Sequence, residues 1–194
     1  SGPEGNHMGG HHLILGELTD YLTGRRLPDT HDERYRQAVS RWLVEQKGYH
    51  REDIQAGVRL EAAAGDKRAR VRLDFAVHSG GRVAMLIKYG PGSLTTRHRI
   101  VLAAAHLLGP WRVPMGVVTN GRDADILDTA DGSVIARGLE GIPDAEALRA
   151  CLERLPPAPV SVQRAELAGR LLYAYEVDDR CPCDDTVCET IRGN

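Results

Sequence analysis

The sequence has no strong excess of charge of either sign and no long apolar run. Its 25 Lys and Arg residues nearly balance its 27 Asp and Glu residues, which gives a formal net charge of -2 at pH 7. Dedicated nucleic-acid-binding domains usually carry a basic excess, so any contact with DNA has to use a local patch. No apolar stretch approaches the length of a bilayer span and no signal peptide opens the chain, so we expect a soluble, cytoplasmic protein without membrane contacts.

Cysteine is also scarce, and the few cysteines are unevenly placed. Cys151 stands alone, whereas Cys181, Cys183 and Cys188 lie close together near the C-terminus. This distribution does not match the disulfide framework of a secreted protein and favours a reducing compartment. The C-terminal cluster has three interpretations: thiolate ligands of Zn²⁺ with a fourth ligand from elsewhere, reactive or disulfide-forming thiols, or an ordinary polar tail. Cys151 follows the apolar face of a predicted helix and is expected to be a buried structural thiol.

The composition predicts one main folded domain with appendages. Of the 194 residues, 42% are hydrophobic and 27% are charged, which is enough apolar material for one sizeable core. The chain divides into residues 1–29 with a tag remnant and an N-terminal arm, residues 30–142 with an α/β domain, and residues 143–194 with C-terminal helices and the cysteine-containing tail.

Two helices are predicted in the first 50 residues. The spacing of Leu15, Leu18 and Leu22 predicts a short helix over residues 13–22, so the N-terminal arm is expected to be helical. Thr30 and Glu33 then form a capping box, and apolar residues at helical spacing follow up to residue 43. This pattern predicts a helix that ends before Gly48.

The central part of the chain alternates strand patterns with turn signals. Between residues 68 and 77, apolar residues alternate with Arg68, Arg70, Arg72 and Asp74, which predicts a strand with one polar face. A hairpin turn leads into residues 82–89, whose central run is apolar and predicts a strand covered on both faces. Further strands are predicted at residues 58–62, 113–119, 125–127 and 133–137, and further helices at residues 94–108, from residue 143 and at residues 162–175.

Five segments, in order along the chain, resemble a known family. They are residues 32–37 (DERYRQ), 43–49 (LVEQKGY), 72–74 (RLD), 88–92 (KYGPG) and 118–121 (VTNG). Together they resemble the N-terminal domain of type I restriction-enzyme R subunits over roughly residues 30–142, and the order of elements is similar to the core of PD-(D/E)xK nucleases. The resemblance implies an α/β fold with a restriction-endonuclease-like mixed sheet flanked by helices.

The resemblance also implies a divalent-cation site at Asp74 and Lys88. Such nucleases hold Mg²⁺ with an Asp on one strand and a Glu two residues before a Lys on the next, because the period of two in a strand directs both side chains to one face. Metal and Lys then position water and stabilise the charge that develops on the scissile phosphate. Asp74 and Lys88 match this pattern, but Leu86 holds the glutamate position and has no oxygen to offer Mg²⁺. We therefore expect a degenerate metal site.

Another carboxylate has to replace the missing glutamate if the site is active. Glu33 is the first candidate, because the resemblance implies an acidic residue from the first helix at the mouth of the site. The competing interpretation makes Glu33 the return half of the capping box with Thr30. Glu61 and Asp66 are weaker candidates, since each is more typical of a solvated surface acid.

Asp74 and Lys88 also have ordinary structural interpretations. Asp74 would form a salt bridge with Arg70 or Arg72 of its own strand. Lys88 would pack its stem against the protein while its ammonium group reaches water. The family resemblance implies instead that Asp74 and Lys88 line a shared pocket that is vestigial or altered. The structural interpretation and the pocket interpretation both stay open.

Five arginines are the predicted DNA-binding residues. Arg68, Arg70 and Arg72 lie on one strand, and Arg97 and Arg99 lie at the start of the following helix. Guanidinium groups in such a patch neutralise backbone phosphates. The same patch also suits a nucleotide or another anion at a helix N-terminus.

These features predict a restriction-nuclease-like domain that binds or cleaves DNA. Hydrolysis would be Mg²⁺-dependent and would use Asp74, Lys88 and Glu33. The alternative is a non-catalytic module that binds a nucleotide, an anion or a protein on the same fold. DNA is the expected partner, and a second copy of the chain or other subunits of a restriction system are further expected partners.

Overall fold

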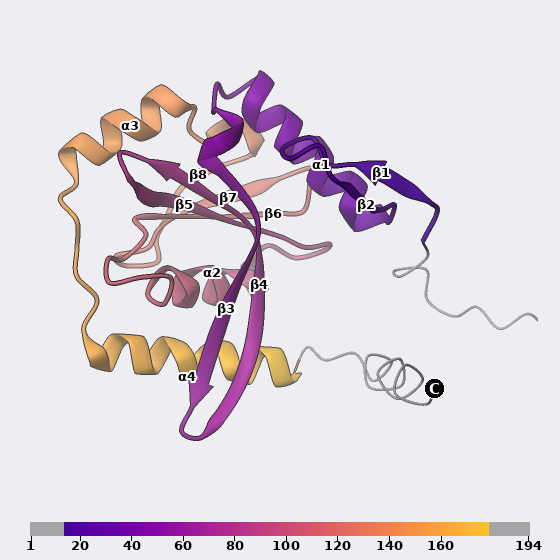
Figure 1. The fold of residues 1–194 in the computed structure, drawn as a ribbon. Helices are drawn as coiled ribbons and strands as arrows, with labels where there is room; N and C mark the ends of the chain where they lie inside the picture. Colours follow the sequence, from indigo (N-terminus) through magenta and orange to yellow (C-terminus); the bar gives the residue numbers. More distant parts are fainter. Residues whose placement is uncertain (1–13, 179–194) are drawn as a thin grey trace, which may run out of the picture.

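The computed structural model describes residues 14–178 (Figure 1). The tag remnant and the three C-terminal cysteines, Cys181, Cys183 and Cys188, lie outside the described residues. The interpretations of the cysteine tail, including a Zn²⁺ site, therefore stay predictions. No helix among residues 14–178 is both long and apolar enough to cross a membrane.

A six-stranded mixed sheet forms the centre of the fold, in the order β3-β4-β5-β6-β7-β8. Its strands are β3 (Ile54–Ala64), β4 (Lys67–Ser79), β5 (Arg82–Tyr89), β6 (Met115–Thr119), β7 (Ala124–Asp128) and β8 (Val134–Arg137). Neighbouring strands are antiparallel except for β5 and β6, which are parallel. A parallel pair needs a crossover connection, and the helical segment between β5 and β6 supplies it.

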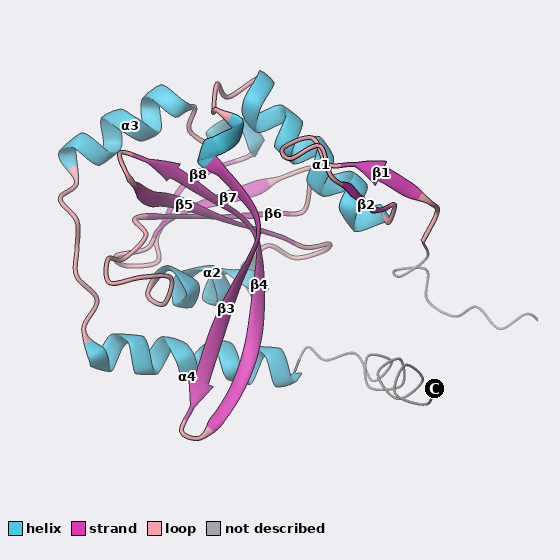
Figure 2. Ribbon diagram, viewed as in Figure 1, coloured by secondary structure: helices cyan, strands magenta, loops and turns pink. Residues whose placement is uncertain are grey.

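Helices cover both faces of this sheet (Figures 1 and 2). One face carries α1 (His31–Glu45) and α3 (Ala145–Arg154), and the other carries α2 (His98–Ala105) and α4 (Val162–Asp178). Single 3₁₀ turns lie at η1 (Arg51–Asp53), η2 (Thr95–Arg97) and η3 (Leu139–Gly141). Leu43, Phe75 and Ile87 belong to the core cluster beneath α1 and α3. Another cluster, beneath α2 and α4, includes Leu73, Leu86 and Leu172. The predicted α/β class, with a mixed sheet flanked by helices, is confirmed.

The helix predicted from the Thr30 signal is confirmed as α1. The Thr30 hydroxyl accepts a hydrogen bond from the Glu33 amide at 3.1 Å, which satisfies one of the free amides of the first turn. The helix ends at Glu45, and Gly48 follows with a φ of 72°, a left-handed conformation that favours glycine.

The N-terminal arm is a β-hairpin, so the prediction of a helix there is wrong. Strands β1 (Glu17–Thr19) and β2 (Arg26–Pro28) pair antiparallel. The Asp20 carboxylate accepts hydrogen bonds from the amides of Leu22 and Thr23, which reverses the chain where the helix was expected to continue. The leucine spacing is helical, but the segment is too short for spacing alone to outweigh this turn.

Smaller differences concern element boundaries. The helix predicted over residues 94–108 is shorter: after Ala105 the amide of His106 bonds to the Ala103 carbonyl, three residues back, and the α-helical pattern ends. The strand predicted from residue 113 begins at Met115, because Pro114 has no amide to donate. The strand predicted over residues 58–62 is longer and begins at Ile54. The added residues have no alternating apolar pattern, but their pairing with β4 keeps them in the strand.

Helix α4 approaches β3 closely at Gly169. A β-carbon at this position would lie 2.8 Å from the carbonyl oxygen of Ala63, and backbone cannot rotate aside as a side chain does. Gly169→Ala should therefore destabilise the protein by about 1–3 kcal/mol, although alanine normally stabilises a helix interior relative to glycine.

Urea unfolding measures this effect, and Arg170→Ala on the exposed side of α4 is the matched control. The control should change the free energy of unfolding by less than about 0.5 kcal/mol. A Gly169→Ala variant as stable as the parent chain would contradict the close packing of α4 on β3.

Candidate functional site

The candidate site lies where β4 and β5 separate. Their backbone pairing reaches the Phe75–Ile87 pair, and side chains link the strands beyond it. The Tyr89 amide donates to Asp74 Oδ2 at 2.7 Å, and Lys88 Nζ donates to the Arg72 carbonyl oxygen at 2.9 Å. The structure thus places Asp74 and Lys88 on neighbouring strands, each next to the last pair of the β4–β5 ladder.

Arg36 of α1 is the ion-pair partner of Asp74. Its Nε lies 2.8 Å from Asp74 Oδ1, and its Nη1 lies 3.1 Å from Glu33 Oε2. The Asp74 side chain is 3% exposed, against 18% for Arg36 and 14% for Glu33. One guanidinium group therefore sits between two carboxylates in a mostly dry environment. Asp74 pairs with α1 rather than with Arg70 or Arg72 of its own strand.

The charge of Arg36 is held in place by its acidic neighbours. Burial by itself would lower the pKa of Arg36, but the hydrogen bond and charge of Asp74, together with those of Glu33, raise the pKa above its usual value. Arg36 is therefore a permanent cation. It compensates the buried charge of Asp74, which would otherwise cost several kcal/mol, on the order of the penalty for an unpaired buried ion.

This donor set does not fit a divalent cation at Asp74. Both carboxylate oxygens of Asp74 already accept hydrogen bonds. Leu86, at the position of the family's second acid, is fully buried in the core cluster that includes Ile100 and Ala104. Among residues 14–178, no group of three or more His, Cys, Asp or Glu side chains is arranged to hold a metal. Mg²⁺ binds through free oxygen ligands, which this arrangement does not offer.

One half of the capping box predicted for Thr30 and Glu33 is present, but the Glu33 carboxylate is used elsewhere. The Glu33 amide is capped by Thr30, as the capping box requires. Its carboxylate, however, accepts hydrogen bonds from Arg36 and from Gln37 Nε2, the latter at 3.0 Å. The acid therefore faces the candidate site as a partner of Arg36. The weaker candidates are exposed: Glu61 lies opposite Arg70 on β3, and Asp66 lies in the turn between β3 and β4.

Two stacked tyrosines fix α1 to β5 beside the site. The rings of Tyr35 and Tyr89 have centroids 3.9 Å apart and an interplanar angle of 18°. Gly121 makes room for Tyr35, because a β-carbon there would lie 2.1 Å from the ring. Burial raises the pKa of both phenols, so both are neutral at physiological pH. This contact holds the helix that carries Arg36 against β5, the strand that carries Lys88.

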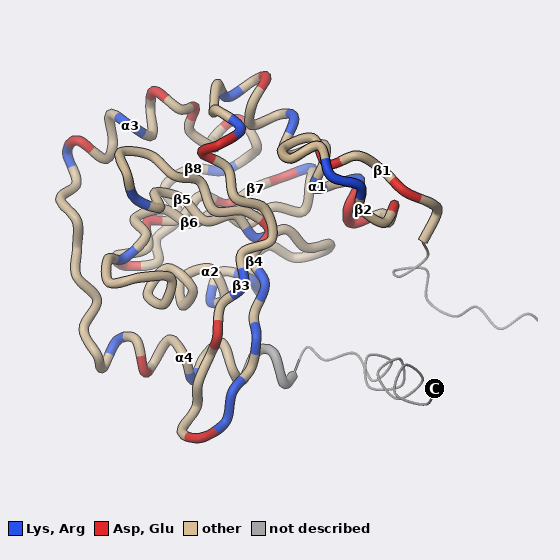
Figure 3. The backbone as a smooth tube through the Cα atoms, in the orientation of Figure 1, with Lys and Arg blue, Asp and Glu red and all other residues tan. Residues whose placement is uncertain are grey.

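The hairpin of β3 and β4 carries a row of exposed arginines, which we call the arginine face. Register places Arg59 opposite Arg72, Glu61 opposite Arg70 and Ala63 opposite Arg68, so these side chains share one side of the hairpin. Its members are Arg59, Arg68, Arg70 and Arg72, all exposed. Figure 3 shows basic residues along this hairpin, which extends beyond the rest of the sheet. The opposite side packs on α4.

The other two predicted arginines lie elsewhere. The Arg97 side chain crosses Gly90, where a β-carbon would lie 2.1 Å from Arg97 Nε, and its Nη1 donates to the Ser93 carbonyl at 2.8 Å. Arg99 lines a pocket between α2 and α4. The structure therefore brings three of the five predicted arginines together on one strand and adds Arg59.

Comparison with known proteins assigns a family. The family model described as type I restriction enzyme R protein N terminus matches residues 31–143, more than half of the chain. The chain belongs to this family. No curated protein and no solved structure matches it. The matched part of this type I restriction R-protein domain includes the candidate site and the arginine face, whereas the N-terminal hairpin, α3 and α4 lie outside it.

Sequence reasoning missed Arg36 and Arg59. Arg36 lies three residues after Glu33 and so on the same side of the helix. This spacing could have predicted the Arg36–Glu33 ion pair. Its second partner, Asp74, is 38 residues away, and no local pattern announces it. Cys151 is free and only half-buried, so the expectation of a buried thiol is met in part.

The Arg36–Asp74 pair should show strong energetic coupling. Arg36→Gln leaves Asp74 charged and buried without its partner, which should cost about 3–5 kcal/mol. Adding Asp74→Asn removes that charge, so the double variant should be more stable than the sum of the two single effects predicts. Denaturant unfolding of all four proteins at pH 7 gives the coupling energy.

Arg34→Gln is the matched control, because Arg34 forms an ion pair with Asp29 while its own side chain is 56% exposed. This control should lose far less stability than Arg36→Gln, because exposed ion pairs contribute little. Additive effects of the Arg36 and Asp74 substitutions would contradict a direct pair.

Proposed function

We propose that the chain is a DNA-binding domain that contacts the phosphate backbone through the arginine face and does not itself hydrolyse DNA. The arginine face is the observation that carries this proposal. Membership in a family of restriction-enzyme R proteins supports DNA as the partner. On the same ground, other subunits of a restriction system are proposed as further partners.

The spacing of the arginine face suits a nucleic-acid backbone. Alternate residues of a strand recur about every 7 Å, which is about twice the 3.4 Å axial spacing of phosphates along one DNA strand. Arg68, Arg70 and Arg72 therefore present guanidinium groups at a spacing compatible with alternate phosphates.

The charge of the arginine face is available to a ligand. Within the described residues 14–178, none of its four guanidinium groups pairs with a carboxylate. Glu61 is the single acidic side chain among the cross-strand positions that face these arginines. A chain with net charge -2 thus carries a local basic surface.

The absence of hydrolysis is proposed from the site beside this surface. Asp74 is compensated by Arg36, Leu86 offers no oxygen, and Lys88 is bonded to the Arg72 carbonyl. These side chains stabilise the junction of α1, β4 and β5 and leave no carboxylate oxygen free at Asp74. Lys88 and Arg36 then serve structure rather than catalysis.

Binding of a fluorescent DNA duplex at several salt concentrations tests the proposal. The affinity should fall with salt, with a slope of log K against log salt of about −0.9 for each phosphate neutralised. Arg68→Gln, Arg70→Gln and Arg72→Gln should each reduce the magnitude of this slope by about 1, with little dependence on DNA sequence. Arg59→Gln should act in the same way.

Arg149→Gln on the exposed side of α3 is the matched control and should leave the slope unchanged. No binding at low salt would contradict DNA as the partner. Binding with an unchanged slope in the triple variant of Arg68, Arg70 and Arg72 would place the DNA on another surface.

A metal-dependent nuclease is the second candidate, favoured by the places of Asp74 and Lys88 on neighbouring strands beside the last β4–β5 pair. Incubation of supercoiled and linear DNA with the protein and Mg²⁺ or Mn²⁺ separates the two candidates. The non-hydrolytic proposal expects intact DNA. Cleavage that both Asp74→Ala and Lys88→Ala abolish would establish the nuclease instead, whereas cleavage that neither variant affects would come from another site or from a contaminant.

A further inference from the structure

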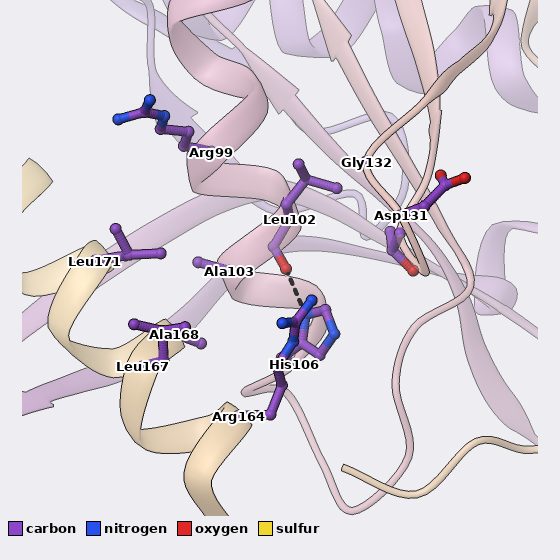
Figure 4. Close-up of a pocket in the computed structure, with 11 residues that line it drawn as sticks. Arg99, Leu102, Ala103, His106, Asp131, Gly132, Arg164, Leu167, Ala168 and Leu171 are labelled. Atoms are coloured by element: carbon purple, nitrogen blue, oxygen red, sulfur yellow. Dashed lines mark hydrogen bonds between the residues drawn. The ribbon is translucent and has the colours of Figure 1, made fainter. Parts of the chain in front are cut away.

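A pocket of about 320 Å³ lies between α2 and α4, on the side of the sheet away from α1 (Figure 4). Its wall is mainly apolar and includes Leu102 of α2 with Leu167 and Leu171 of α4. The two α4 leucines are 49% and 39% exposed, which is unusual for residues that face a groove beside the core. Exposure of apolar side chains to water is unfavourable, so an apolar ligand that covers them would gain free energy from their burial.

Two arginines supply positive charge to the same pocket. Arg99 comes from α2 and Arg164 from α4, and neither pairs with a carboxylate in the described part of the chain. Asp131 is the one acidic residue in the lining, and its carboxylate accepts a hydrogen bond from the Ser133 amide at 2.8 Å. The pocket therefore has a net positive charge.

His106 is a neutral, oriented side chain of the pocket lining. Its Nδ1 lies 2.8 Å from the Leu102 carbonyl oxygen, which only accepts, so Nδ1 carries the proton. Burial lowers the pKa of His106; the hydrogen bond with the Leu102 carbonyl opposes this by less, and the positive charges of Arg164 and Arg112 lower the pKa further. The ring is then neutral at pH 7, so the positive charge of the pocket comes from its arginines alone. His106 is 9% exposed, so the pocket fixes its orientation.

We propose that this pocket binds a small amphipathic carboxylate, with a hydrocarbon body against the three leucines and its charged group on Arg99 or Arg164. The volume lies near the lower end of the range typical of small-molecule sites, which suits a medium-chain acid. The apolar wall disfavours a highly charged ligand, and the two free guanidinium groups disfavour a cation. This site is separate from Asp74 and from the arginine face, so it does not depend on the proposed DNA binding.

Calorimetric titration of the full chain with sodium decanoate tests the proposal. Decanoate should bind saturably at one site and raise the melting temperature, since a ligand of the folded state stabilises it. Decyltrimethylammonium, which has the same hydrocarbon chain and the opposite charge, should not bind there. Arg99→Gln and Arg164→Gln should each weaken decanoate binding, and their combination by about tenfold or more.

Two further variants guard against a general loss of folding. Leu167→Glu places a carboxylate at a half-exposed position of the pocket wall and should abolish decanoate binding with little loss of stability in urea. Arg149→Gln is the control and should bind as the parent does. The proposal fails if decanoate does not bind, if decyltrimethylammonium binds equally well, or if the Arg99 and Arg164 variants bind decanoate as tightly as the parent.

Discussion

A buried aspartate that needs a positive charge is the constraint on which the centre of this molecule depends. Asp74 lies on β4 among apolar side chains, and an uncompensated carboxylate there would be strongly destabilising. Arg36 supplies the charge from α1, and the Tyr89 amide supplies the second hydrogen bond from β5. One side chain thus ties the first helix to both central strands. The polar network continues to the N-terminal hairpin, in the order Asp74, Arg36, Glu33, Gln37 and Asp20.

The Arg36–Asp74 pair also bears on function. The family resemblance implies both DNA binding and metal-dependent hydrolysis, and the pair affects only the second. A nuclease site of the expected kind needs carboxylate oxygens that are free to hold a cation. Here the oxygens of Asp74 are used within the protein, and Leu86 contributes to the core instead. The arginine face lies apart from this pair, on the exposed side of the β3 and β4 hairpin. We therefore propose that the arginine face contacts phosphates. The residues that resemble a catalytic site, Asp74 and Lys88, are proposed to stabilise the fold.

Much of the fold follows from local patterns. The strand over residues 82–89 was predicted with its observed bounds, and Thr30 correctly marked the start of α1. The degenerate metal site expected from Leu86 stays a prediction. The prediction of a helical N-terminal arm was wrong. Hydrogen bonds that the Asp20 carboxylate accepts form a turn there, and the leucine spacing does not reveal it.

The residues that sequence reasoning missed depend on contacts distant in the chain. Arg36 meets Asp74 only after α1 packs on the sheet, and Arg59 joins the arginine face only through the register of β3 with β4. Such pairings arise from tertiary packing, which a single sequence does not encode in any short window.

The claim that Arg36 compensates Asp74 in place of a divalent cation is tested most directly by Mn²⁺ titration followed by electron paramagnetic resonance. Mn²⁺ free in solution gives a sharp signal that weakens when the ion binds protein. If Arg36 fills this role, the parent chain should leave the signal as strong as Asp74→Asn does at equal Mn²⁺ concentration. A saturable loss of signal in the parent chain that Asp74→Asn removes would show a metal site at Asp74 and would contradict the claim.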